Sequence, residues 1–139
     1  MHEGTCQFPN AKLYINELEY AAWTDSTADL NVQVINTLDA YRDNIVLFHA
    51  GDTLEGGVVA IAAYGHTPGH TIFQKDSILV VGDIMHGVAL QLEHPEYCAA
   101  YDKDPETAIA SRIRVLDYAK QNNLILYGMH FPAPGYIKF

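Results

Sequence analysis

The segment Gly65-His66-Thr67-Pro68-Gly69-His70-Thr71 is the part of the sequence from which the fold can best be predicted. Its glycines and proline are typical of a tight, rigid turn. The β-prone run that follows, through Gln74, predicts a short strand. The turn therefore places His70 at the beginning of a strand.

Two other predicted strands end in residues that can bind a metal. Val81-Gly82-Asp83 ends one apolar strand, and Tyr127-Gly128-Met129-His130 ends another. In open α/β folds, sites form from loops at the C-terminal ends of strands. Two histidines and one aspartate on rigid turns suit a divalent cation such as Zn²⁺. The alternative is that each side chain simply packs or caps a strand end.

The remaining strands and helices indicate an α/β layered domain, because the two kinds of element alternate along the chain. Short β-prone runs lie at 12–15, Ile45–Phe48, 58–64, 70–74, 78–81 and 124–127. These runs are almost continuously apolar, as in sheets that are covered on both faces. With only about three predicted helices to cover them, we expect burial to depend on further sequence or on a homo-oligomeric partner.

Three helices are predicted from their caps and their periodicity. Asn16 with Glu19 forms a capping box for the first. The second carries Leu30, Val34, Leu38 and Tyr41 on one face. The third begins at Asp104-Pro105-Glu106, has an apolar stripe of Ile109, Ile113 and Leu116, and ends at Asn122-Asn123.

Composition excludes some classes of function. The 139 residues are 49% hydrophobic and 18% charged, which is typical of a single globular domain. The net charge of -9 argues against nucleic acid and anionic membranes as general partners. The sequence has neither a run of about 20 apolar residues nor a recognisable signal peptide. Cys6 and Cys98 lack metal-site spacing, so the cellular compartment stays open.

Taken together, the motifs GHTPGHT, GD and GMHFPAPG resemble the later motifs of the metallo-β-lactamase superfamily. The wider sequence is similar to its branch of methyl parathion hydrolases and quorum-quenching lactonases, notably in FPNAKLYINELEYAAW and QLEHPEYCAAYDKDPETAIASRIRVLDYA. The resemblance covers nearly the whole chain. It implies part of an αββα sandwich, mainly the second half.

The resemblance also implies roles for the three predicted ligands. His70 would bind a first metal ion, Asp83 would bridge both ions and act in catalysis, and His130 would bind the second. The family's HxHxDH element would lie before residue 1, apart from its last histidine, which falls on His2. The alternative for His2 is a flexible terminal histidine. We therefore expect residues 1–139 to be one truncated domain that binds two metal ions weakly or not at all.

Other histidines have less specific predicted roles. His66 belongs to the turn and is expected to shape the loop or support a ligand. His86 follows Asp83 closely and is a candidate for the substrate pocket. His49 and His94 are expected to be structural or solvated.

Three functions remain open at the level of sequence. The first is a hydrolase acting on a small-molecule ester, lactone, amide or phosphoester through a metal-bound hydroxide, as the resemblance implies. The second is a non-catalytic remnant or interaction module with the same fold. The third is a mononuclear metal-binding protein that uses His70, Asp83 and His130 as ligands, with or without His2.

Overall fold

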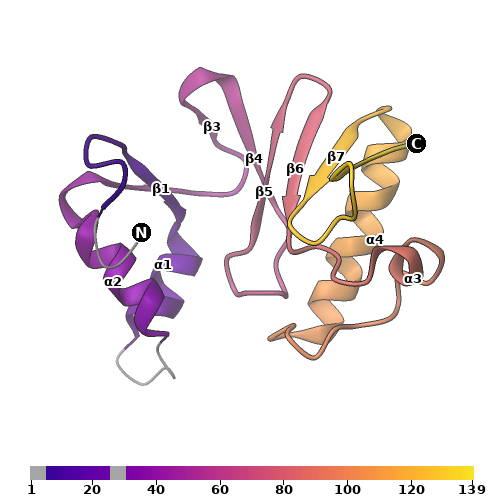
Figure 1. Cartoon of the computed structure of the whole chain (residues 1–139), viewed down its shortest axis with the longest axis horizontal. Coiled ribbons are helices and arrows are strands. Elements are labelled where there is room, and N and C mark those ends of the chain that lie inside the picture. The colour runs from indigo at the N-terminus through magenta and orange to yellow at the C-terminus, as the bar shows by residue number, and fades with distance from the viewer. Residues whose placement is uncertain (1–5, 26–30) are drawn as a thin grey trace. The chain divides into compact units, whose positions relative to one another are not determined.

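A computed structural model describes residues 6–25 and 31–139. The chain divides into two compact units, Met1–His49 (unit 1) and Ala50–Phe139 (unit 2), each described here by itself (Figure 1). Compact units of this kind also occur within one domain, so the expected single domain stays a prediction. His2 lies outside the described residues.

The described residues of unit 1 form two parallel strands and two α-helices. Strand β1 (Leu13–Asn16) pairs with β2 (Ile45–Phe48), with Leu13 opposite Ile45. Between them run α1 (Glu17–Thr24), α2 (Val32–Ala40) and the short 3-10 helix η1 (Arg42–Asn44). The predicted N-cap of α1 is confirmed, because the Asn16 side chain accepts a hydrogen bond from the Leu18 amide at 2.9 Å.

Unit 2 is built on a six-stranded sheet with the order β3-β4-β5-β6-β7-β8 (Figure 1). The strands β6 and β7 are parallel, while the other neighbours are antiparallel. Because β6 and β7 are parallel, their C-terminal ends meet at one edge of the sheet. The bounds are β3 (Thr53–Leu54), β4 (Val58–Ala62), β5 (Thr71–Lys75), β6 (Ile78–Gly82), β7 (Ile125–Gly128) and β8 (Tyr136–Lys138), with the 3-10 helix η2 (Glu55–Gly57) between β3 and β4.

The connection from β6 to β7 supplies the helices of unit 2, α3 (Val88–Glu93) and α4 (Pro105–Gln121). Helix α4 begins as predicted: Asp104 accepts a hydrogen bond from the Thr107 amide, and Pro105 occupies the first turn. One core joins α4 to the sheet and to the loops at its edge. Its buried members are Ala63, Ile72, Leu79, Val81, Ile84, Met85, Val88, Val115, Leu116, Ala119, Leu124, Leu126 and Phe131.

The predicted apolar stripe of α4 is wrong in one position. Ile113 is 40% exposed, whereas the buried face carries Ser111 and Arg112 beside Val115 and Leu116. The spacing of apolar residues did not predict this buried face, because two of its residues, Ser111 and Arg112, are polar. Arg112 is buried because backbone carbonyls and a carboxylate satisfy its donors, as described below.

Only one face of the sheet is buried in the core. Along β6, Leu79 and Val81 are fully buried, while Ile78 and Val80 are 41% and 47% exposed. Val59 on β4 and Tyr127 on β7 are also partly exposed. These side chains explain the near-continuous apolar runs of the sequence. That a homo-oligomeric partner or further sequence covers them stays a prediction, which sedimentation velocity would test.

The short elements β3, α3 and β8 were not predicted, because none has more than six residues and none has a repeating pattern. Within the described ranges, no helix combines the length and apolar character needed to cross a membrane.

Candidate metal centre

The turn containing His66 and His70 is fixed against the beginning of α4. The Gly65 carbonyl accepts a hydrogen bond from the Asp104 amide at 2.9 Å, and the His66 carbonyl accepts one from the Lys103 amide at 3.2 Å. Gly65 has a φ of +122°, and a Cβ there would lie 2.1 Å from the Ala108 amide nitrogen. Only glycine allows this approach. The turn is therefore as rigid as its glycines and proline predict.

His70 lies between β4 and the end of β6, and its two ring nitrogens have different neighbours. Its Nδ1 is 3.0 Å from the Ala63 carbonyl, which can only accept, so the proton belongs on Nδ1. Its Nε2 then accepts a hydrogen bond from the Asp83 amide at 3.2 Å. The tautomer leaves the Nε2 lone pair directed at the end of β6. At that end Gly82, with φ +53°, lies so close that a Cβ would be 3.0 Å from His70 Nε2.

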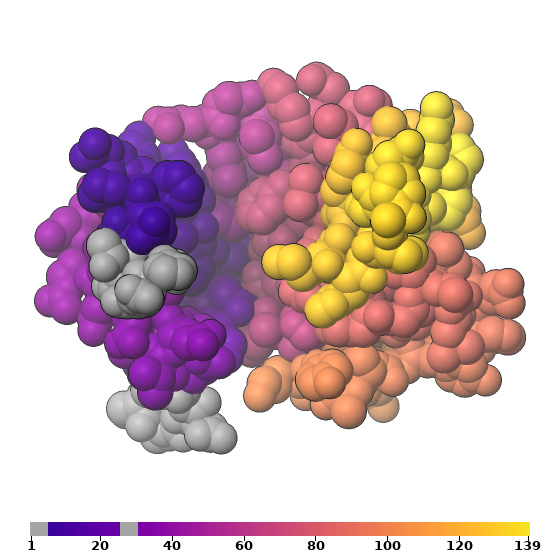
Figure 2. All heavy atoms as spheres, in the orientation of Figure 1, coloured from indigo at the N-terminus to yellow at the C-terminus, as the bar shows by residue number. Residues whose placement is uncertain are grey.

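Asp83 and His130 come together across the parallel strands β6 and β7. The Asp83 Oδ1 atom lies 2.9 Å from His130 Nε2, with the two side chains 30% and 46% exposed. The backbone also links the two strand ends, because the Met129 amide donates a hydrogen bond to the Gly82 carbonyl at 3.0 Å. Figure 2 shows the yellow C-terminal segment at the surface of unit 2. A cation could therefore reach both side chains from solvent.

His86 lies among the other site histidines, where the sequence suggested only a residue of the substrate pocket. Its ring centroid is 5.0 Å from that of His66 and 4.9 Å from that of His130. Buried Gln91 of α3 fixes the loop, because its Oε1 accepts hydrogen bonds from the His86 and Gly87 amides at 2.8 and 3.0 Å. Burial lowers the pKa of His86, and nearby His66 lowers it further. The imidazole is thereby favoured in its neutral form, which is the form that binds metals.

His66 contacts a buried aspartate, Asp102, which in turn pairs with the buried Arg112. Arg112 donates to the carbonyls of Ile84, Pro95 and Tyr97 at 2.7 to 2.8 Å, and it contacts Asp102 Oδ2 at 3.3 Å. The side chains of Arg112 and Asp102 are each 1% exposed.

Asp102 in turn contacts two further side chains. Its Oδ1 lies 3.0 Å from His66 Nδ1, and its Oδ2 accepts from Cys98 Sγ at 2.8 Å. Burial alone would raise the pKa of Asp102, but the hydrogen bonds from Cys98 and His66 and the charge of Arg112 outweigh it and lower the pKa. Asp102 is therefore an ionised carboxylate at neutral pH. The Asp102 carboxylate thus contacts His66. That His66 shapes the loop or supports a ligand stays a proposal.

Among the described residues, the structure forms two groups of side chains whose ligand atoms lie within 4.8 Å of one another. One consists of Asp83, His86 and His130, and the other of His66, His86 and Asp102. His70 is adjacent to the first group through the Asp83 amide but is not a member of it. His86 belongs to both.

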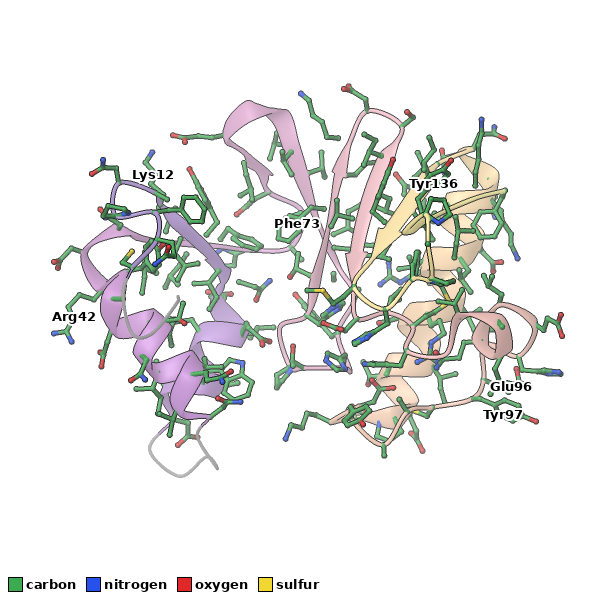
Figure 3. All side chains as sticks on the ribbon, in the orientation of Figure 1. Lys12, Arg42, Phe73, Glu96, Tyr97 and Tyr136 are labelled. Atoms are coloured by element: carbon green, nitrogen blue, oxygen red, sulfur yellow. The ribbon has the colours of Figure 1, made fainter. Side chains whose placement is uncertain are left out.

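The donor set of the first group fits a divalent metal. Two imidazoles and a carboxylate are typical of zinc sites with an open position. The buried Nδ1 atom of His86 has no hydrogen-bond partner among the described residues, so it is available to a ligand. His94 belongs to neither group and lies 3.3 Å from Glu96, which is labelled in Figure 3. His49, in unit 1, pairs with Glu17 at 2.9 Å.

Sequence reasoning missed Asp102 and Arg112. In the sequence, Asp102 lies in a polar loop without a motif. Arg112 lies in a predicted helix, where an arginine is usually exposed to solvent. No local pattern of the sequence marks either residue. Only the structure shows that Ser111 and Arg112 lie on the buried side of α4 with Val115 and Leu116.

Comparison with solved structures gives the fold. AidC, described as a dizinc quorum-quenching lactonase in complex with a product, matches with a TM-score of 0.83 and 22% identity over 97% of this chain and 53% of its own. The hydrolase AbOPH of the β-lactamase superfamily matches with 0.82 and 27% over the same shares. A probable metal-dependent hydrolase from Staphylococcus aureus matches with 0.61 and 26% over 70% of this chain and 36% of its own.

Sequence comparison adds no relative: no protein-family model matches, and no curated protein matches closely enough to count as one. This chain spans about half the length of the first solved structures it matches. The α/β architecture predicted from the sequence is confirmed, as is the resemblance carried by GHTPGHT, GD and GMHFPAPG. The chain therefore has part of the metallo-β-lactamase fold and is similar in structure to the metal-dependent lactonases and hydrolases of that superfamily.

Proposed function

We propose that this chain provides His70, Asp83 and His130 to the metal centre of a hydrolase that acts on small molecules. The observation that carries the proposal is the 2.9 Å approach of His130 Nε2 to Asp83 Oδ1 at the paired ends of β6 and β7. His70, which directly precedes β5, contacts the Asp83 amide through Nε2 at 3.2 Å. The three proposed ligands therefore flank the ends of three strands of one sheet.

Each side chain has a distinct part in this proposal. His70 has its tautomer set by the Ala63 carbonyl and offers Nε2 as a ligand. His130 offers Nε2 and reaches solvent. Asp83 is the proposed catalytic residue, because its partly exposed carboxylate can bridge two cations and accept a hydrogen bond from an attacking water. A bound divalent ion would supply Lewis acidity toward a carbonyl or phosphoryl oxygen.

The proposed substrate is a small ester, lactone, amide or phosphoester. AidC is a lactonase by its description, and AbOPH a hydrolase, which supports hydrolysis of such a bond. Among these classes we propose a lactone first. The cation is proposed to be Zn²⁺, since imidazole and carboxylate suit it and AidC is described as a dizinc enzyme.

A second candidate function is metal binding without turnover. It is favoured by the group of Asp83, His86 and His130, which can hold one ion with three ligands from this chain. In this alternative His86 replaces His70 as the third ligand.

One set of measurements separates the two functions. The purified chain is titrated with Zn²⁺ by calorimetry and assayed with an N-acyl homoserine lactone and a p-nitrophenyl ester, beside His130→Ala and the control His94→Ala. Zinc-dependent turnover that His130→Ala removes supports the hydrolase. Zinc binding that depends on His130 without turnover supports the second candidate. If His130→Ala and His94→Ala bind zinc as the unmodified chain does, the ligand assignment is wrong.

A further inference from the structure

The group of His66, His86 and Asp102 lies beside the proposed hydrolytic centre and shares none of its three ligands. We propose that these side chains bind a further cation, a borderline divalent transition metal ion such as Zn²⁺ or Co²⁺, at a site separate from that centre. The proposal does not depend on the hydrolase function. It rests on the donor set, on the anchoring of Asp102, and on a buried ring nitrogen of His86.

The donor atoms are close enough for one ion after a small movement. Each residue offers an atom within 4.8 Å of the others, and His66 Nδ1 lies 3.0 Å from Asp102 Oδ1. Ligands of Zn²⁺ lie at about 2.0–2.2 Å from the ion, so two ligands in a tetrahedral shell are about 3.4 Å apart. The His66–Asp102 pair is already about that close, and the ligand atom of His86 lies within 4.8 Å of both, a gap that rotation of its imidazole ring can narrow.

Asp102 is held so that one oxygen faces His66. Its Oδ2 is engaged by Arg112 at 3.3 Å and by Cys98 Sγ at 2.8 Å. Its Oδ1 contacts His66, where a proton now occupies the place that an ion would take. A hydrogen-bonded, buried carboxylate is typical of well-ordered metal ligands. Because Arg112 already neutralises part of its charge, we expect weaker binding than a carboxylate without an arginine would give.

His86 belongs to both groups, and its ring nitrogen without a partner among the described residues can serve a cation in one of them at a time. Its Nδ1 is buried, and within the part of the chain that the structure describes it has no hydrogen-bond partner. Buried polar atoms are nearly always paired, so such an atom calls for an unseen partner. The other reading is that Asp102 only pairs with Arg112 and orients His66, with His86 left unpaired.

The test isolates the proposed site from the hydrolytic one. The variant His70→Ala/His130→Ala lacks two of the three hydrolase ligands, and it is titrated with Co²⁺ by visible absorption and by calorimetry. We expect it to retain one Co²⁺ site. Adding His66→Ala should then lower the affinity by roughly 10-fold or more, by analogy with losses from outer-shell changes. Adding His94→Ala, the matched control at an exposed histidine, should leave it unchanged.

Folding is controlled separately. Far-UV circular dichroism compares every variant with the unmodified chain, and His66→Gln is made in case His66→Ala unfolds, because glutamine can still donate a hydrogen bond to Asp102. His66→Gln should fold and lose the Co²⁺ site. The proposal is overturned if the double variant binds no Co²⁺, or if a folded His66 variant binds it as tightly as the double variant. Failure of the hydrolase proposal would appear instead as insensitivity of zinc binding to His130→Ala.

Discussion

Units 1 and 2 both combine a sheet with helices, but their hydrophobic cores differ in size. In unit 2, thirteen buried side chains form one cluster that joins the sheet, α3 and α4. Among the described residues of unit 1, Leu38 and Phe48 are the buried hydrophobic side chains. A segment of about 50 residues rarely supports a stable core by itself. The candidate metal ligands that the structure describes all lie in unit 2, so the chemistry rests on the better packed region.

Among the substitutions that compare the two units, Arg112→Ala is expected to have the largest effect on stability. The change leaves Asp102 as a buried charge without its cation, which we expect to lower the free energy of unfolding by about 3–5 kcal/mol. Its counterpart in unit 1 is Arg42→Ala, which breaks an exposed pair with Asp39 and should change stability by less than about 0.5 kcal/mol. Urea denaturation measures both. Equal effects would mean that the buried pair contributes nothing beyond a surface pair.

A core substitution should have the next largest effect. Leu126 is fully buried in unit 2, and Leu126→Ala should cost about 2–4 kcal/mol, whereas Leu47→Ala, at a 49% exposed position in unit 1, should cost less than about 1 kcal/mol. Trp23, the single tryptophan, reports on unit 1 by fluorescence. We expect Leu126→Ala to shift the transition seen by circular dichroism more than the fluorescence transition. The reverse order would contradict the contrast between the units.

Metal affinity gives a third comparison. His70→Ala should lower Zn²⁺ affinity by roughly 10-fold or more, which is about 1.4 kcal/mol, because it removes a proposed ligand. His49→Ala in unit 1 removes a histidine that pairs with Glu17 and should leave affinity unchanged. Calorimetric titration compares the two variants. Unchanged affinity in His70→Ala would remove it from the ligand set.

The smallest effect is expected at helix caps. Asp104→Ala removes the hydrogen bonds to the Thr107 amide and hydroxyl at 3.1 and 2.7 Å, and should cost about 1 kcal/mol in unit 2. Asn31→Ala removes the 2.9 Å bond to the Gln33 amide in α2. We expect hydrogen exchange to quicken in α4 for the first and in α2 for the second. Faster exchange in both helices from either change would show that the two units unfold together.

The features predicted correctly from the sequence are those encoded locally. The cap of α4 depends on Asp104 and Pro105, which are adjacent, and the turn before β5 depends on its own glycines and proline. The three short motifs also pointed to Asp83 and His130, whose side chains lie 2.9 Å apart in the structure. Their role as metal ligands stays a prediction.

What could not be predicted depends on contacts between distant segments. Asp102 pairs with His66 across 36 positions, and Arg112 reaches the carbonyl of Ile84 across 28. No local pattern distinguishes these residues from solvated charges. Nor does periodicity distinguish the exposed Ile113 from the buried Val115, because the helix buries its arginine in place of an apolar residue.

The parallel pairing of β6 with β7 also has a consequence for the order of folding. The meander from β3 to β6 joins neighbours in sequence, so its contacts need only short loops to close. Asp83 and His130 meet only after the chain has passed through α3 and α4 and closed a much longer loop. We therefore expect the ligand pair to form late, with its contacts largely absent from the folding transition state. Substitutions there would change the unfolding rate more than the folding rate.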